Sequence, residues 1–434
     1  MLWLKLYLNT INVMTKIECA IIEVLIAIRL GGQFLIQLVS IVMTGNVDEE
    51  TSLTKVFRYL LIIGTCLATF IVIKRKLYKS IKEQHIYFLL FLLLYTGFMY
   101  YYLFIDNTRT YHGTDAISRF TTVINNVLFL SIVSMTFVSQ KINSTLICKI
   151  IVIFAFISSY LYLTFFGIKF GDAYDGFLSQ DLGFSSLQIG YFSGMSLLLT
   201  LYLYREWSKS VIINNIFTFI LVITFLYIII SSGKTGPTIF TFFVALIICK
   251  QLFFQNMSTM KFVAILFCLL LLSVIFFNSI LSIIDNYNPN LATKISNTFL
   301  KGDTSNRDFL FEEALRVFNE NIFCGSYFEL KKYGIYPHNF FLENLITWGI
   351  IGTTIMLIFL WKAFKISLKL ILSNSQLSWV CYLFFFSFLS AQSTGSLYGN
   401  YRFWLAFTIL ITISNVKYGT KISQRYHTDL FTRR

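Results

Sequence analysis

His338 stands directly before a long apolar run, in the stretch 336–339 (YPHN). An imidazole titrates near neutral pH, so a histidine at the mouth of a helix can accept a proton as a general base. Pro337 suits the first turn of that helix. At about 100° per residue, His338, Gly349 and Gly352 would share one face, and the glycines would let a neighbouring helix approach beneath the histidine. A histidine that merely lies at a membrane interface is the simpler interpretation of this residue alone.

Two cations are candidates for holding an anion near this histidine. Lys234 lies in the glycine-flanked turn 231–237 (SSGKTGP), where backbone N–H groups could also face an anion. A lysine that snorkels from a short hairpin explains Lys234 equally well. Arg307 follows Asn306 and precedes an amphipathic stretch, FLFEEALRVF.

The segment 306–318 is predicted to be a short amphipathic helix. Its start, 305–308 (SNRD), resembles a capping box with an aspartate in the third position. One face would carry Arg307 at the head of an apolar stripe, at the spacing of a helix. We therefore expect Arg307 to point toward the membrane surface; the stripe consists of Phe311, Ala314, Leu315 and Phe318.

The composition excludes a soluble globular domain. Of 434 residues 56% are hydrophobic and only 13% are charged, whereas a soluble domain carries roughly 25% charged residues. The net charge of +14 does not indicate a nucleic-acid partner, because the basic residues form short clusters between apolar runs. The seven cysteines show no CxxC pairing, so neither a disulfide framework nor a zinc site is expected.

Twelve apolar runs have the character of transmembrane helices, which predicts an all-α polytopic membrane protein. Lysine and arginine gather in alternate connections: the segments 74–82 and 417–434 hold five each. By the positive-inside rule, both termini are then cytoplasmic. The predicted spans lie near 20–43, 56–73, 86–105, 123–138, 146–168, 187–204, 212–230, 235–249, 262–281, 340–361, 377–395 and 402–416.

One external connection is much longer than the others. The segment 282–340 separates the ninth span from the tenth and contains the predicted helix 306–318. Long connections without a function are uncommon. We interpret residues 1–434 as a single integral-membrane domain with this large loop on its outer face.

The remaining charged residues are weaker candidates. Arg402, Arg109, His112 and Arg119 could line a sugar-binding groove, although solvated loop residues explain them more simply. Glu23 and Arg29 fall inside the first span, where ionisable groups are costly and are functional candidates by default. Six residues apart, Glu23 and Arg29 point in different directions and do not form an obvious pair.

These motifs together resemble the O-antigen ligase and polymerase superfamily of membrane glycosyltransferases. The resemblance rests on Asn306-Arg307 before an apolar helix, the turn 319–325 (NENIFCG), and His338-Asn339 followed by Glu343, Gly349 and Gly352. It covers about 50 residues, and the large loop after the ninth span supports it. This chain has Ile322 where the family usually has a proline, and Lys234 where relatives have an arginine between a serine and a glycine.

The resemblance implies an O-antigen polymerase in the bacterial inner membrane, with its active site facing the periplasm. It would join repeat units carried on undecaprenyl diphosphate during lipopolysaccharide biosynthesis. His338 and Arg307 would be catalytic, Lys234 and Arg307 would bind the diphosphate, and Asn339, Glu343 and Arg402 would contact substrate.

No metal or other cofactor is expected, because the sequence has no acidic cluster suited to a divalent cation. Besides the lipid bilayer and the lipid-linked oligosaccharide, the implied partners are a chain-length regulator and the flippase for the repeat unit.

Two other functions stay open. An O-antigen ligase shares these motifs and transfers the glycan to the lipid A core instead. A flippase or transporter for the same lipid-linked sugar also has many spans, but it predicts inverted repeats with broken helices in matching positions of two halves. The three prolines, Pro237, Pro289 and Pro337, all lie near or in external loops, which disfavours that arrangement.

Overall fold

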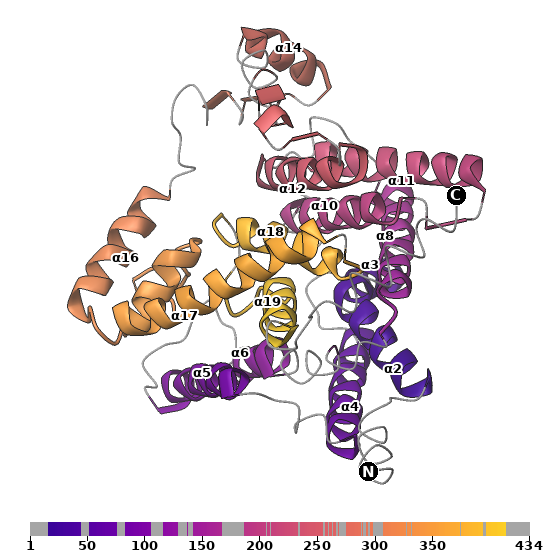
Figure 1. The fold of residues 1–434 in the computed structure, drawn as a ribbon. Coiled ribbons are helices and arrows are strands. Elements are labelled where there is room, and N and C mark those ends of the chain that lie inside the picture. The colour runs from indigo at the N-terminus through magenta and orange to yellow at the C-terminus, as the bar shows by residue number, and fades with distance from the viewer. Residues whose placement is uncertain are drawn as a thin grey trace.

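The computed structural model describes residues 16–44, 52–75, 83–105, 116–128, 137, 142–166, 186–204 and 307–413, except 327, 331, 374 and 394–395. Between 206 and 297 it describes all residues except 209, 233–234, 255–256, 259, 263, 266–267, 269–274, 288, 290–291 and 294–295. The described residues form helices and their connections, with one isolated antiparallel bridge between Leu330 and Ile335. Figure 1 shows the helices packed in several directions, with α14 (Phe277–Tyr287) set apart.

Four helices are long and apolar enough to cross a membrane: Ile86–Phe104, Ser144–Thr164, Val211–Ser231 and Gly236–Phe253. The bent pair Lys16–Gly32 and Phe34–Ser40 would make a fifth. Three shorter apolar helices are Tyr59–Lys74, Ser378–Ser390 and Tyr401–Ile413. Exposed apolar side chains along one helix, such as Ile212, Phe219 and Ile223, are what a lipid-facing surface requires. A helical chain with several helices long and apolar enough to span a membrane is therefore confirmed, whereas the number twelve and the topology stay predictions.

The N-terminal helices meet at an irregular turn. The chain runs through α2 (Lys16–Ala27), the π-helical segment η1 (Ile28–Gly32) and α3 (Gln33–Thr44), beside α4 (Ser52–Lys74) and α8 (Ser144–Phe166). The two halves bend by 57° at this point. A Cβ on Gly31 would lie 3.3 Å from the Ile151 Cα, so a small residue here lets α8 approach closely.

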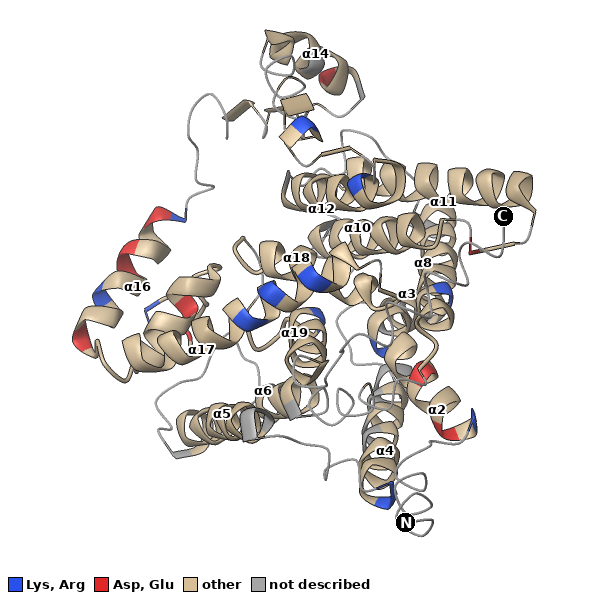
Figure 2. Cartoon of the chain, in the orientation of Figure 1, with Lys and Arg blue, Asp and Glu red and all other residues tan. Residues whose placement is uncertain are grey.

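The middle of the chain forms a layer of three helices, α10 (Ser186–Tyr202), α11 (Val211–Ser231) and α12 (Thr235–Phe253). α10 lies between its two neighbours and also contacts α8 and α18 (Ser378–Ser390) (Figure 1). Figure 2 shows that the visible part of this layer is almost free of charged residues, as a membrane-embedded layer would be.

The C-terminal helices α17 (Phe340–Leu372), α18 and α19 (Tyr401–Ile413) share an aromatic core. Phe384, Phe403 and Phe407 stack on one another with ring centroids 5.2 to 6.3 Å apart, and Trp379 and Trp404 are fully buried. α19 also packs against the π-helical segment η4 (Ile124–Leu128), which follows α6 (Ala116–Val123). α5 (Glu83–Tyr100), with η3 (Tyr101–Ile105), packs aromatic side chains against α17. This core fixes the turn that joins α18 to α19.

Three local predictions around α17 are wrong. α17 begins at Phe340 after its N-cap Asn339, so Pro337 lies outside the helix rather than in its first turn. The helix is also broken at Gly349, whose φ of 60° and ψ of −163° are not helical. His338 therefore precedes the helix, and it does not share a helical face with Gly349 and Gly352.

The amphipathic helix exists but is rotated relative to the prediction. α16 spans Asp308–Glu320 rather than 306–318, and Arg307 caps it without a side-chain hydrogen bond. The expected capping serine, Ser305, lies outside the described residues together with Asn306. Leu315 is 49% exposed, whereas the buried face consists of Leu310, Glu313, Ala314 and Val317. Packing on α17 decides the orientation, because apolar residues occupy more than one side of this helix.

Candidate functional site

α16 and the first part of α17 pack together through a small apolar cluster. Leu310, Ala314 and Val317 of α16 meet Leu330 and Ile346, and all five are buried. The two helices run in the same direction, because the turn after α16 reaches the break in α17 while Arg307 lies near His338. This packing places the N-termini of both helices at one end of the pair.

The turn after α16 is bonded to the break in α17 through backbone atoms. The freed N–H groups of Ile350 and Ile351 donate to the carbonyls of Ile322 and Phe323, at 2.8 and 3.2 Å. In return, the Ser326 N–H donates to the Ile346 carbonyl at 2.8 Å. We call this arrangement the backbone clasp, formed by residues 322–326 and 346–351. It satisfies polar groups that a broken helix would otherwise leave unbonded.

Two glycines make the clasp possible. Gly325 and Gly349 both have positive φ, 69° and 60°. A Cβ on Gly349 would overlap backbone atoms of Phe323, and a Cβ on Gly325 would overlap backbone atoms of Thr347. The expected close approach at Gly349 is therefore real, but the neighbour is the turn after α16 and not another helix. Gly352, by contrast, lies against Trp348 of its own helix.

His338 has an unusual backbone and a partly buried ring. Among the described residues it is the only non-glycine one with positive φ, 54°. Such a conformation costs a non-glycine residue energy and is enriched at functional sites. The ring packs edge-on against Tyr336, with centroids 4.6 Å apart, and the described residues provide no hydrogen-bond partner for its buried Nδ1.

Arg307 approaches His338 from the start of α16. Burial, and to a smaller extent the positive charge of Arg307, together lower the pKa of His338 to about 4. The imidazole is therefore neutral at physiological pH and can accept a proton. The Arg307 guanidinium donates to the backbone carbonyl of Ser393, in the turn that follows α18. Arg307 is thus near enough to His338 for its charge to act on the imidazole.

The other side of this site comes from α10 and α12. The Ser393 hydroxyl lies 3.1 Å from the hydroxyl of Tyr191 on α10. A Cβ on Gly236 would lie 2.6 Å from the same tyrosine oxygen, so the start of α12 approaches it closely. Gly236 belongs to the segment 231–237, which the sequence pattern marks as a candidate anion site. Lys234 itself lies outside the described residues, whereas its neighbours in that turn reach the site of Arg307.

Tyr191 and Ser393 are not among the residues predicted from the sequence. Tyr191 lies in the second turn of α10 and Ser393 shortly after the end of α18. Hydroxyl residues in or near apolar helices occur many times in this chain, so composition gave no signal for these two. Only the packing of α10 against α18 and α12 brings them together.

The side chains of Asn339 and Glu343 bind backbone N–H groups of the chain itself. The Asn339 side chain caps α17 by accepting from the N–H groups of Phe341 and Leu342, at 3.0 and 3.1 Å. Glu343 is 3% exposed and accepts from the Leu397 N–H at 2.7 Å. Both thus position backbone, in α17 and in the turn before α19.

A second buried carboxyl holds the same turn. The Tyr398 hydroxyl donates to Glu329 at 2.6 Å, and Glu329 is 2% exposed. Together with Glu343, this contact ties the turn between α18 and α19 to the segment around His338. Arg402, predicted to contact substrate, follows this turn and is half-buried, with its guanidinium carbon 5.1 Å from the Tyr401 ring centroid and 5.8 Å from that of Phe192.

The comparisons with known proteins give no further assignment. No protein-family model, no curated protein and no solved structure matches this chain.

Proposed function

We propose that the chain is a glycosyltransferase that uses undecaprenyl-diphosphate-linked saccharides at the outer face of the bacterial inner membrane. The observation that carries this proposal is that the charge of Arg307 acts on His338, two residues to which the motif resemblance assigns catalysis. A neutral imidazole next to a fixed cation suits the transfer of a sugar from a diphosphate to a hydroxyl.

The reaction needs two tasks from these residues. His338 takes the proton from the acceptor hydroxyl as its oxygen bonds to the anomeric carbon of the donor sugar. The bond between that carbon and the diphosphate oxygen breaks at the same centre, and undecaprenyl diphosphate leaves with the bonding electrons. Arg307 stabilises the negative charge that grows on the leaving diphosphate. The proton, the bonding electrons and the leaving group are all accounted for in this step without a metal ion.

The location of polar contacts supports a two-sided membrane protein with the site at its outer face. Arg307, His338, Ser393, Tyr191 and Gly236 all lie at helix ends that the charge distribution predicts to face outward. The opposite ends have separate contacts. There, Arg75 donates to Glu18 at 2.9 Å, and the Tyr202 hydroxyl donates to the Gln376 carbonyl at 2.7 Å.

Within this class we favour an O-antigen polymerase over a ligase, by analogy with the motifs around Lys234. The two functions differ in the acceptor, so complementation of defined strains separates them. In a polymerase-deficient strain the core still receives one repeat unit, and this chain should restore long chains. In a ligase-deficient strain no repeat unit reaches the core, and restoration there would assign ligase activity instead.

The decisive variants remove the imidazole without disturbing the backbone. Asparagine tolerates the left-handed conformation of His338, so His338→Asn should keep the fold, whereas His338→Ala adds backbone strain. We expect both variants to lose polymer while their amount in the membrane stays normal. Near-normal ladders of long O-chains from His338→Asn would exclude this residue as the base.

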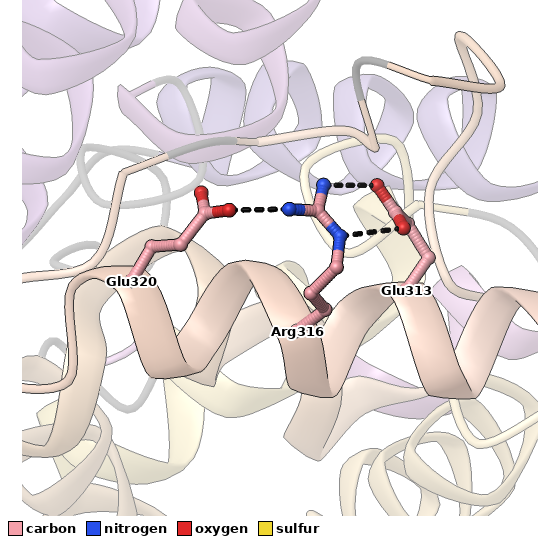
Figure 3. A network of polar contacts seen from close by, with 3 residues as sticks. All are labelled: Glu313, Arg316 and Glu320. Atoms are coloured by element: carbon pink, nitrogen blue, oxygen red, sulfur yellow. Dashed lines mark hydrogen bonds and ion pairs between the residues drawn. The ribbon is translucent and has the colours of Figure 1, made fainter.

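A matched control for Arg307 lies on the same helix, α16. Arg307→Ala should cost more activity than Arg307→Lys, because lysine retains the charge but not the two-pronged guanidinium. Arg316→Ala removes the same charge from the exposed face of α16, where Arg316 bonds to Glu313 and Glu320 (Figure 3). Equal losses in Arg307→Ala and Arg316→Ala would indicate a structural arginine at both positions.

A further inference from the structure

Arg29 is a buried cation in an irregular segment. It lies in η1, at the bend of the first membrane helix pair, and is 6% exposed. Its guanidinium donates to the Asn126 side chain in η4, another π-helical segment. Asn126 in turn donates to the Tyr398 carbonyl at 3.0 Å. Two irregular segments that are distant in sequence thus meet at one polar contact, and such π-helical turns are frequent at functional sites.

Arg402 approaches the same place from α19. The guanidinium carbons of Arg29 and Arg402 each lie 5.1 Å from the Tyr401 ring centroid. Arg402 donates no hydrogen bond to any described residue. Among the residues that the structure describes, neither arginine has a carboxylate within ion-pair distance, and the buried Nε atom of each lacks a hydrogen-bond partner.

Two guanidinium groups beside one ring, without an acid, form an uncompensated positive site. Charges buried in proteins are normally paired, because their desolvation is costly. Cation–π contact with Tyr401 offsets part of that cost, but it leaves the N–H donors of Arg402 and those that Arg29 does not direct to Asn126 available. An anion that supplies acceptors to both guanidinium groups would compensate the charge and the missing hydrogen bonds together.

We propose that Arg29 and Arg402 form a binding site for the carboxylate group of a sugar-sized ligand. The shape of the donors favours a carboxylate, since the edge of a guanidinium presents two parallel N–H groups to two coplanar oxygens.

A phosphate site at a helix start normally adds backbone N–H groups. Here those groups are engaged: the N–H of Phe403 donates to the Asn400 side chain, and that of Trp404 to the Asn400 carbonyl.

This site is separate from His338 and Arg307, and its existence does not depend on the proposed reaction. Phe192, which lies under Arg402, is the neighbour of Tyr191 on α10, so the two sites flank the same end of that helix. An acidic sugar bound at Arg29 and Arg402 would therefore lie close to the groups around Ser393. If the chain transfers glycans, the ligand is an acidic residue of the saccharide.

The test measures binding to the purified, full-length chain in detergent. Thermal unfolding is followed while sodium glucuronate is added at constant ionic strength, with glucose and glycerol 3-phosphate as the comparison ligands. We expect a saturable rise in melting temperature with glucuronate only. Arg29→Gln and Arg402→Gln should each weaken the apparent affinity at least tenfold. Lys149→Gln, which removes a cation lying 5.8 Å from the Trp207 ring, is the matched control and should leave it unchanged.

Each alternative outcome decides against the proposal. A wild-type chain that shows no saturable response, or responds equally to glucose, has no such site. A stronger response to glycerol 3-phosphate would mean a phosphate site. A response that survives in both arginine variants would show that these residues only brace the helices. If Arg29→Gln does not fold, Arg402→Lys is the deciding variant. Two-pronged binding by the Arg402 guanidinium predicts a tenfold loss of affinity for glucuronate in this variant, and an unchanged affinity contradicts the proposal. Survival of the glucuronate response in His338→Asn separates this result from the fate of the proposed reaction.

Discussion

Replacing Gly349 by alanine should destabilise the protein far more than an ordinary glycine substitution. The φ of 60° and ψ of −163° belong to a region that is essentially restricted to glycine, and strain of this kind costs about 1–3 kcal/mol. The added methyl group would also overlap the backbone of Phe323, so the turn after α16 must move away.

Moving that turn breaks the backbone clasp. The bonds from Ile350 to Ile322 and from Ile351 to Phe323 are each worth about 1 kcal/mol. Strain and lost bonds together predict a loss of about 3–5 kcal/mol in the free energy of unfolding. Gly325→Ala should cost a similar amount, and the double variant should cost less than the two losses added, because both act on one contact.

Reversible unfolding of the purified protein in mixed micelles measures this difference. Gly97→Ala is the matched control, because no atom lies within 4 Å of the position of its Cβ and α5 continues through it. Alanine there should change stability by no more than about 1 kcal/mol, in the favourable direction. If Gly349→Ala proves as mild as Gly97→Ala, the clasp does not hold α17 in its broken form.

The remaining predictions concern three polar contacts. His338 is neutral above its pKa of about 4, so the acidic limb of kcat/KM should lie near pH 4; Arg307→Gln should move it upward, and an unmoved limb would mean that Arg307 does not act on the histidine. Tyr398→Phe removes the donor to buried Glu329 and should cost about 1–3 kcal/mol in unfolding experiments, whereas Tyr401→Phe, whose hydroxyl bonds to no described residue, should cost little.

In the network of Figure 3 the Arg316 and Glu320 side chains are exposed, so Arg316→Ala should lower the melting temperature only slightly, and less at high salt. The Arg316 guanidinium lowers the pKa of Glu313, so this contribution is present above the ordinary pKa and is lost as pH falls through the lowered one. A loss that is independent of salt and pH would contradict it.

Several helices formed where apolar length and punctuation predicted them, because these signals are local. The spans predicted at 146–168 and 212–230 correspond closely to α8 (Ser144–Phe166) and α11 (Val211–Ser231). The irregular segments gave no such signal. The apolar residues around Gly349 predict a continuous helix. The break there is favourable only because the turn after α16 docks against it, and no local pattern indicates that contact.

The predicted orientation of α16 was wrong for a related reason. Its apolar residues cover more than half of its circumference, so periodicity alone allows several faces, and the partner helix selects one. The pairing of Arg307 with His338 was predicted from a motif resemblance, whereas Tyr191, Ser393 and the contact of Arg29 with Asn126 depend on long-range packing that no local pattern records.

The geometry around His338 links the strength of the base to the binding of an anion. Alone, a histidine with a pKa of about 4 is a weak proton acceptor, because burial and Arg307 both oppose its charged form. A diphosphate bound to Arg307 would cancel part of that positive charge and would add a negative charge near the imidazole. Both changes favour the protonated form and raise the pKa toward its ordinary value. The base would then be strong only while a donor is bound, so the chain would not activate an acceptor hydroxyl in the absence of a sugar to transfer.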